Sequence, residues 1–350
     1  MRYTDTLMFI LVLLSAISCC EEKPDGPTTK THHGIFVSNE GTFNFNNASV
    51  GWYDLTQKKY FGQVYRDSND VKVGDVLQSI LLTGDTAWLV INNSNRILLM
   101  DAGDFKQIGE VGGLTSPRYA LPVGGRYVWV SDYKSDSITV VDLRTLKVDH
   151  RFRFAPGWSE QMLEVGTKVW VTHPALYSGA PTHYIYEVDS RSERVTDSIR
   201  VPASPVAIVR GRTGEGWVYC QGHTPSGTPG GIARVSFDSK EVLDSVTFAS
   251  GGTQPLGAGL SYDAKGERVF YLREDVFVID AASSSSPRRI VPAEGKTFYA
   301  MRYIPDLGEV WVSDAIDFVQ RGVVERYTSD GVFLSRFTAG VIPNGFYALP

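Results

Sequence analysis

Cysteine is scarce in this 350-residue chain, which contains only three. Two of them, Cys19 and Cys20, are adjacent and follow an apolar N-terminal stretch, so Cys220 alone remains in the body of the protein. A single cysteine has no partner, which excludes a disulfide framework there. Cys220 lies in the segment WVYCQG, which has the character of a strand, and we expect it to be a small buried side chain.

Excess positive charge and catalytic motifs are also lacking. The formal net charge is -5, so the chain offers no basic face to phosphates, which argues against a nucleic-acid-binding protein. The motifs G-x-S-x-G and H-E-x-x-H and the P-loop are absent. His173, His183 and His223 come from two loops at spacings that define no zinc site, and we expect solvated or hydrogen-bonded histidines. We therefore predict no catalytic residue, no metal and no cofactor.

No apolar run is long enough to span a membrane as a helix. The run Leu7–Leu14 continues only weakly to Ile17, whereas a bilayer core of ~30 Å needs about 20 residues. A short apolar run of this kind near the N terminus is typical of a signal peptide, which we predict over residues 1–18.

The segment after this run predicts a lipid anchor and a tether. Ser18 directly before Cys19 resembles a bacterial lipobox, in which the cysteine becomes the lipidated N terminus. Residues 19–34 are acidic, proline-containing and without periodicity, as in a flexible tether. The acidic start resembles the surface-export signal of lipoproteins from Gram-negative gut anaerobes. Lipidation at Cys20 and an ordinary secretory signal are the alternatives.

The rest of the chain has the composition of an all-β protein and an internal repeat. Gly (34), Tyr (17), Phe (17) and Trp (7) are plentiful, and helix-period apolar stripes are scarce. A short apolar strand followed by a polar loop recurs as IFVSNE, AWLVINN, VWVSDY, VWVTHP, WVYCQG, VFYLRE and VWVSDA. The next strand of each unit ends near an aspartate: Asp54, Asp101, Asp142, Asp189, Asp238, Asp280 and Asp330. From first to last these span 276 residues in six steps, an average of 46. This period predicts a seven-bladed β-propeller over residues 35–350.

The C terminus predicts how the ring closes. Residues 346–349 read FYAL and match FYAM at 298–301 and RYAL at 118–121, which begin other blades. The last segment is therefore expected to be a lone innermost strand that completes the first blade and removes an open sheet edge. An open solenoid or a two-domain β-sandwich does not explain this ending.

One face of the ring is predicted to carry the function. The loops between second and third strands include NEGTFNFNNAS, HPALYSGAPTHY, QGHTPSGTPGG and DAIDFVQRG, which are long for hairpins, whereas the opposite face has tight turns. Aligning the chain on the FYAL pattern adds a ring of equivalent residues at the mouth: Gln78, Tyr119, Gln161, Val206, Tyr299 and Tyr347. The tyrosines among them are also expected to pack blade against blade. Aromatic rings and amides suit a large, uncharged, partly polar ligand. The candidate ligand-binding residues are Phe43, Asn93, Arg118, Tyr119, Tyr133, Trp158, Tyr177, His223, Tyr299, Phe318 and Tyr347.

The segments IFVSNEGTFNFNNASVGWYDL, GDVLQSI, INNSNRILLMD, GLTSPRYAL and ITVVDLRTLKV resemble the YncE-like propeller lipoproteins of gut bacteria. The resemblance runs from Ile35 to Pro350 and is greatest in the first three blades. Within that group the chain is most similar to the corrinoid-binding BtuG type. That resemblance implies a lipid-anchored outer-membrane protein that faces the cell exterior, captures corrinoids such as vitamin B12 (cobalamin) and delivers them to a TonB-dependent transporter. A protein-binding surface scaffold and a propeller hydrolase or lactonase are the alternatives.

Overall fold

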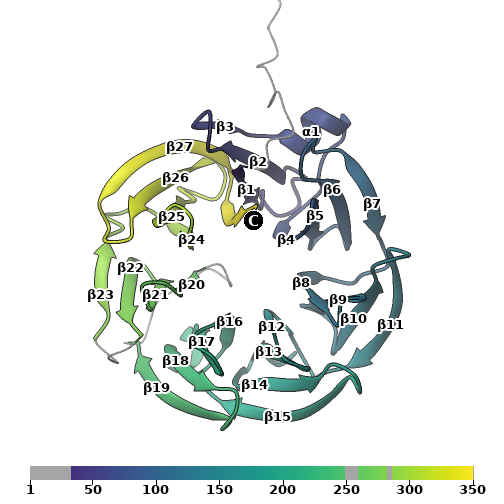
Figure 1. The fold of residues 1–350 in the computed structure, drawn as a ribbon, viewed down its shortest axis with the longest axis vertical. Helices are drawn as coiled ribbons and strands as arrows, with labels where there is room; N and C mark the ends of the chain where they lie inside the picture. The colour runs from purple at the N-terminus through teal and green to yellow at the C-terminus, as the bar shows by residue number, and fades with distance from the viewer. Residues whose placement is uncertain (1–32, 249–258, 282–285, 350) are drawn as a thin grey trace, which may run out of the picture.

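The computed structural model describes residues 33–248, 259–281 and 286–349, in which seven four-stranded antiparallel sheets form a ring (Figure 1). Blade 1 contains β28 (Pro343–Ala348), β1 (Gly34–Asn39), β2 (Ser49–Asp54) and β3 (Lys59–Phe61). Blade 2 contains β4 (Leu77–Thr83), β5 (Thr86–Ile91), β6 (Arg96–Asp101) and β7 (Gln107–Val111), and blade 3 contains β8 (Pro117–Val123), β9 (Tyr127–Asp132), β10 (Ser137–Asp142) and β11 (Lys147–Arg153). Within the described residues, the prediction of a seven-bladed β-propeller is confirmed.

The remaining blades follow in chain order around the ring. Blade 4 contains β12 (Met162–Val165), β13 (Lys168–Ala175), β14 (Pro181–Asp189) and β15 (Arg194–Arg200), and blade 5 contains β16 (Pro205–Arg210), β17 (Glu215–Cys220), β18 (Gly231–Ser236) and β19 (Glu241–Thr247). Blade 6 contains β20 (Leu260–Asp263), β21 (Arg268–Leu272), β22 (Val276–Asp280) and β23 (Arg288–Val291), and blade 7 contains β24 (Phe298–Ile304), β25 (Glu309–Asp314), β26 (Arg321–Thr328) and β27 (Phe333–Val341). Two short helices, α1 (Val64–Asn69) and η1 (Thr224–Ser226), lie between strands. No helix in the described part of the chain is long and apolar enough to cross a membrane.

The last strand closes the ring as the sequence predicts. β28 pairs antiparallel with β1, with Phe346 opposite Val37, and it is the innermost strand of blade 1. Asn344 joins blade 1 to blade 2, because its side-chain amide donates hydrogen bonds to the carbonyls of Leu77 (2.9 Å) and Gln78 (3.1 Å). The two ends of the chain thus complete one sheet and leave β1 with no open edge.

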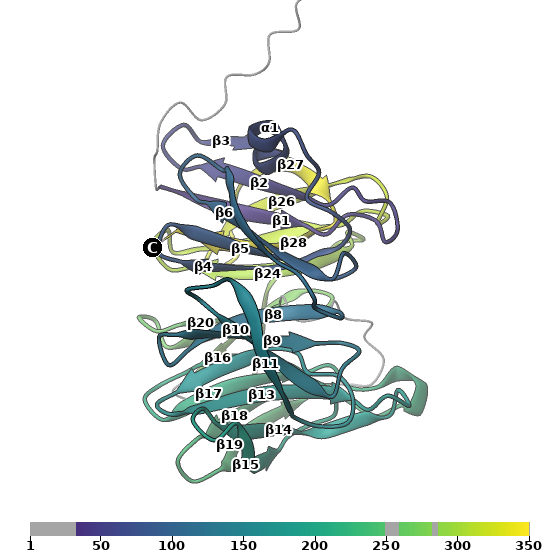
Figure 2. The ribbon, with the colours of Figure 1, turned by 90° about the vertical axis from the view of Figure 1, so that its right-hand side faces the viewer.

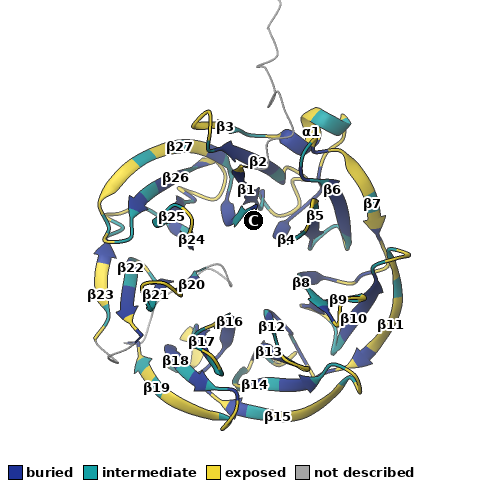
Figure 3. Ribbon diagram, viewed as in Figure 1, coloured by how far each residue is buried: buried dark blue, intermediate teal, exposed yellow. Residues whose placement is uncertain are grey.

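Large aromatic side chains on the second strand of most blades fill the space between blades. Trp88, Trp129, Trp170 and Trp311 are fully buried. The outermost strands are largely exposed, as the colouring of Figure 3 shows. A strand buried on both faces needs the continuous apolar runs that the sequence repeats, and an edge strand does not. Cys220, at the end of β17, is fully buried, and burial raises the pKa of its thiol well above the usual value.

The repeated aspartate has a structural role at the turn into the outermost strand. The carboxylate of Asp54 accepts the backbone N–H groups of Thr56 and Gln57, both at 2.8 Å. Asp142 does the same for Arg144 and Thr145, and these bonds together with Arg126 lower its pKa to about 2. Aspartate is favoured in such turns because its carboxylate accepts hydrogen bonds from backbone N–H groups two or three residues further along the chain. Asp101 and Asp189 cap the same turn in blades 2 and 4, so the aspartate period of the sequence marks this turn in four blades. In blades 5 and 7 the position is taken by Ser236 and Thr328, so Asp238 and Asp330 are not equivalent to the other aspartates.

The loops divide between two opposite faces of the ring (Figure 2). The loop after the second strand of a blade meets the loop that leads into that blade, since the backbone N–H of Tyr133 donates to the carbonyl of Ser116 (3.0 Å) and that of Gln221 to the carbonyl of Ser204 (2.8 Å). We call this side the loop face. The other face carries the tight turns between first and second strands, such as the pair Thr83–Thr86.

Candidate functional site

The strand register corrects the ring of residues expected at the mouth of the loop face. Val312 of β25 and Val130 of β9 are equivalent residues of the second strand. Val312 pairs with Met301, the fourth residue of FYAM, whereas Val130 pairs with Ala120, the third residue of RYAL. The tight turn of blade 3 is one residue shorter than that of blade 7, which shifts the register. The six equivalent positions in the described blades are Gln78, Arg118, Glu160, Val206, Tyr299 and Asn344. The predicted equivalence of Tyr119, Gln161 and Tyr347 is therefore wrong.

Arg118 and Glu160 form a buried ion pair in this corrected ring. The guanidinium makes two hydrogen bonds to the Glu160 carboxylate, from Nε at 2.8 Å and from Nη2 at 2.7 Å, and a third to Gln78. Burial opposes the charge on Arg118, but Glu160 outweighs it and the pKa of the guanidinium is raised. The indole N–H of Trp158 also donates to Glu160. The pair therefore holds an aromatic side chain of the loop face in a fixed orientation.

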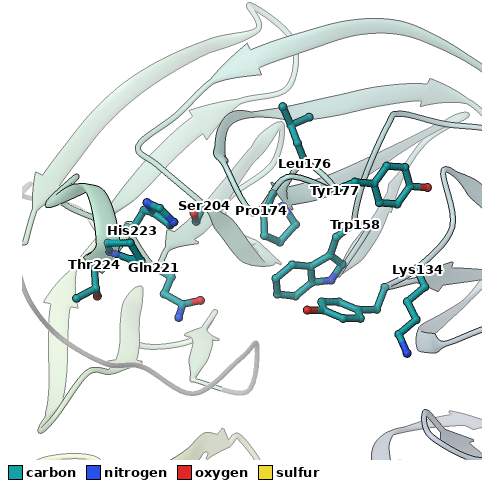
Figure 4. A pocket seen from close by; sticks show the side chains of 14 residues that line it. Lys134, Trp158, Pro174, Leu176, Tyr177, Ser204, Gln221, His223 and Thr224 are labelled. Carbon is teal, nitrogen blue, oxygen red and sulfur yellow. The ribbon is translucent and has the colours of Figure 1, made fainter.

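A pocket of about 620 Å³ opens beside this ion pair, over blades 3, 4 and 5. Four of the predicted site residues line it, namely Tyr133, Trp158, Tyr177 and His223. The rings of Tyr133 and Trp158 meet edge to face with centroids 4.9 Å apart, and the Arg118 guanidinium lies 5.6 Å from the Trp158 ring. Figure 4 shows Trp158 and Tyr177 on one side of the pocket and Gln221, His223 and Thr224 on the other. One side of the wall is thus largely aromatic, with Lys134 beside Trp158, and the other side is polar.

Sequence reasoning missed several residues of this pocket. Lys134, Leu176, Ser204 and Gln221 line it and were not predicted. The loop predicted over 173–184 is shorter than expected, because β13 continues to Ala175 and β14 begins at Pro181. Its tip nevertheless projects, and Tyr177 is 61% exposed. The sequence signal that could have predicted Lys134 is its position next to Tyr133, which was itself a predicted site residue.

A second group of predicted residues lies over blades 1, 2 and 7. The ring of Phe318 packs edge-on against Tyr299 (5.7 Å), whose hydroxyl donates to Glu40 at 2.9 Å. The loop of Phe43 contacts the loop of Phe318, since Thr42 Oγ1 donates to the Phe318 carbonyl (3.1 Å). Phe43, 60% exposed, makes no part of the pocket over blades 3 to 5. These residues form a separate surface, which we call the blade 1/7 patch: Phe43, Phe45, Ile316, Phe318 and Val319.

Three further candidates have structural contacts. Asn93 donates to Asp75 Oδ2 (2.6 Å) and to Asn44 Oδ1 (3.1 Å), which braces the loop that carries Phe43. Tyr347 packs against the core between blades 1 and 2, and burial raises the pKa of its hydroxyl. Burial likewise raises the pKa of Tyr119. These three side chains contribute to packing and hydrogen bonding within the ring, and they do not line the pocket over blades 3 to 5.

Two of the three histidines predicted on the loop face, His173 and His223, are hydrogen-bonded through their side chains. His173 is buried, and its Nδ1 contacts the carbonyl of Trp158 at 2.7 Å; desolvation lowers its pKa. His223 Nδ1 lies 2.7 Å from Ser226 Oγ. Over residues 33–248, 259–281 and 286–349 there is no group of three or more His, Cys, Asp or Glu that could hold a metal ion. Cys19, Cys20 and the predicted signal peptide lie outside the described residues.

Fold and sequence together define the class as a seven-bladed β-propeller with a loop-face pocket. The chain belongs to the family DUF5074, described as a domain of unknown function, whose model matches residues 33–225. No curated protein sequence matches the chain.

Solved structures share the fold at low sequence identity. A quinonprotein alcohol dehydrogenase-like protein from Bacteroides thetaiotaomicron has a TM-score of 0.67 and 12% identity, covering 93% of this chain and 80% of its own. Hydrazine synthase from Kuenenia stuttgartiensis has a TM-score of 0.64 and 14% identity, covering 76% and 87%. The computationally designed protein Ika8 has a TM-score of 0.56 and 11% identity, covering 88% and 87%. At such identities the likeness concerns the fold alone.

Proposed function

We propose that this protein captures a corrinoid in the pocket over blades 3, 4 and 5. The observation that carries the proposal is the lining of that pocket, in which Trp158 and Tyr177 lie opposite the Gln221 amide (Figure 4) and the ring of Tyr133 contacts Trp158. A corrinoid is a flat macrocycle surrounded by amide side chains. Aromatic surface and neutral hydrogen-bonding groups match such a molecule better than a charged pocket would.

The binding surface is partly formed in advance. Trp158 is held by its hydrogen bond to Glu160 and by its edge-to-face contact with Tyr133. A ring that is already oriented loses little conformational entropy when ligand arrives, which favours affinity. Capture and release require no chemical step, so we infer a binding protein and not an enzyme.

Binding is expected to depend on the exposed aromatic residue at the rim. We expect Tyr177→Ala to weaken cyanocobalamin binding roughly thirty-fold, because truncation of an aromatic anchor costs about 2 kcal/mol. Isothermal titration calorimetry measures the Kd of wild type and variant. Tyr184→Ala is the matched control, since Tyr184 is a partly exposed tyrosine of the same blade that does not line the pocket. Absence of wild-type binding at micromolar protein rejects the corrinoid, whereas equal loss in both variants rejects this pocket.

The proposal extends to the cell surface. We infer that Cys19 carries a lipid that anchors the protein to the outer membrane, facing the exterior, and that the bound corrinoid passes to a TonB-dependent transporter. The support is the lipobox-like Ser18–Cys19 junction and the resemblance to the BtuG type. Cys19→Ser is expected to release the protein from the outer-membrane fraction or to block its maturation, as fractionation and immunoblotting would show. Unchanged membrane association of this variant would contradict lipidation at Cys19.

A protein-binding scaffold is the second candidate, and the blade 1/7 patch favours it. Phe45 and Val319 are 68% and 66% exposed there. Exposed apolar side chains that gather in one place often mark a contact surface for another protein. A wild-type protein that binds no corrinoid would leave this candidate ahead.

A further inference from the structure

One histidine lines the pocket over blades 3, 4 and 5. His223 lies on its polar wall, opposite Trp158 (Figure 4), and is half-buried there. His173 is buried away from the lining, and both ring nitrogens of His150, on the outer strand β11, are bonded to carboxylates. Of the histidines that the structure describes, only His223 therefore presents an imidazole to a ligand in this pocket.

A closed turn holds the backbone of His223. Its N–H donates to the carbonyl of Thr228 (2.8 Å), and the N–H of Thr228 donates back to the carbonyl of His223 (3.1 Å). Gly227 completes the turn with a φ of 64°, in the left-handed region that favours glycine. Gly222, directly before His223, has a φ of 80°, and a Cβ there would lie 2.5 Å from the backbone nitrogen of Gly230. The imidazole is thus carried by a preorganised loop, which lowers the entropy lost when a ligand binds.

The hydrogen bonds of Ser226 assign the tautomer of His223. Ser226 Oγ donates its proton to the His223 carbonyl (3.3 Å), so it accepts from His223 Nδ1, which lies 2.7 Å away. With the proton on Nδ1, a neutral imidazole keeps the lone pair on Nε2. Nε2 has no hydrogen-bond partner among the residues that the structure describes. The side chain is therefore oriented through one nitrogen, while the other is left to accept a bond from a ligand.

This arrangement is the one found in metal-binding histidines, which donate the N–H of the second ring nitrogen to a neighbouring oxygen. His223 has no companions for a free ion, since the described residues contain no group of three or more His, Cys, Asp or Glu that could hold a metal. A single imidazole is sufficient only for a metal that arrives with the rest of its coordination. A corrinoid is such a ligand, because its ring nitrogens hold the cobalt and leave the axial positions to other groups, often an exchangeable water.

We propose that His223 binds the cobalt of a captured corrinoid through Nε2, in the place of an exchangeable axial water. This inference rests on the proposed function and names the residue that contacts the metal. The Co–O bond breaks and the water leaves with its electron pair, while the Nε2 lone pair forms a Co–N bond. Cobalt stays Co(III), no proton is transferred and the macrocycle is unchanged, so the exchange is a step of binding. Ser226 is a positioning residue, because it acts through the imidazole that it orients.

Two corrinoids separate coordination of the metal from capture of the macrocycle. Cyanide holds cobalt too firmly for an imidazole to displace it, so cyanocobalamin reports capture alone, whereas aquocobalamin reports both. We expect wild type to shift the visible absorption spectrum of aquocobalamin toward that of its imidazole complex. Calorimetry should show a preference for aquocobalamin over cyanocobalamin of roughly ten-fold or more, the scale on which partners of a metal site change metal affinity.

His223→Ala should lose both the spectral shift and the preference, because no nitrogen remains to replace the water. His183→Ala is the matched control, since His183 lies on β14 outside the pocket lining, and it should retain both. Ser226→Ala keeps the imidazole and removes the oxygen that orients it, so it should lower the preference, and it tests the proposal even if His223→Ala does not fold.

The possible failures are distinguishable. Wild type that binds cyanocobalamin but leaves the spectrum of aquocobalamin unchanged overturns coordination by His223 and leaves the proposed function standing. A folded His223→Ala variant that retains the spectral shift also overturns it. Wild type that binds neither corrinoid rejects the proposed function, and this inference with it.

Discussion

Removal of residues 342–350 is expected to prevent the ring from closing and to leave a protein that aggregates or melts far below wild type. The deletion takes β28 from blade 1 and exposes the edge of β1. It also removes the buried side chain of Phe346, which packs on Trp311 (5.8 Å), and the hydrogen bonds of Asn344 to blade 2. An unpaired inner edge is a template for association with other chains. Thermal denaturation and light scattering measure the two effects.

A single substitution tests the same closure with less disruption. Phe346→Ala is expected to lower the free energy of unfolding by about 3–5 kcal/mol, as is usual for truncation of a buried phenylalanine. Phe333→Ala on β27 is the matched control, because Phe333 is 52% exposed and should change stability little. A truncated protein that melts like the full chain, or equal effects of the two substitutions, would contradict closure through β28.

The fold could be predicted because its repeat consists of features that short stretches of sequence determine. Each blade repeats a strand buried on both faces, and in four blades an aspartate caps the turn after the third strand: Asp54, Asp101, Asp142 and Asp189. Both features depend on neighbouring residues only. Closure was also predictable, because a lone copy of the inner-strand motif at the C terminus has one place to pair. Register was not. FYAM and RYAL look equivalent in sequence, but the length of the following tight turn fixes the pairing, and Arg118 takes the place expected for Tyr119.

The candidate site was predictable as a face and not as a set of partners. Tyr133, Trp158, Tyr177 and His223 meet around one pocket, because adjacent blades bring their loops together. Phe43 and Phe318 belong to the same face but lie over other blades. A one-dimensional alignment gives no distance around the ring, so it could not separate the two groups. Neither could it reveal that Glu160, an ordinary surface residue by composition, is buried against Arg118.

Glu160→Gln is expected to be strongly destabilising although it changes the shape of the side chain very little. Arg118 and Glu160 have side-chain exposures of 7% and 0%, and Glu160 is the group that chiefly holds the charge on Arg118 against desolvation. Removing one member of a buried pair costs about 3–5 kcal/mol, because the remaining charge is left without compensation. Urea-induced unfolding followed by Trp fluorescence would measure the loss. Corrinoid affinity should fall as well, since a neutral amide oxygen is a weaker acceptor for the Trp158 indole N–H than the carboxylate is.

Two companion variants separate the buried charge from general damage. Glu267→Gln disrupts the exposed pair with Arg212 and should cost at most about 1 kcal/mol, as is typical of surface ion pairs. The double variant Arg118→Met, Glu160→Leu removes both charges and should regain most of the stability, because apolar replacements of a whole buried pair are often neutral or better. If Glu160→Gln costs no more than Glu267→Gln, solvent reaches the Arg118 guanidinium, and the ion pair is not the rigid support for Trp158 that its geometry implies. If the single variant is destabilised and the double variant recovers, the pair orients the loop face at no net gain in stability, which is the arrangement expected where a rigid Trp158 serves binding.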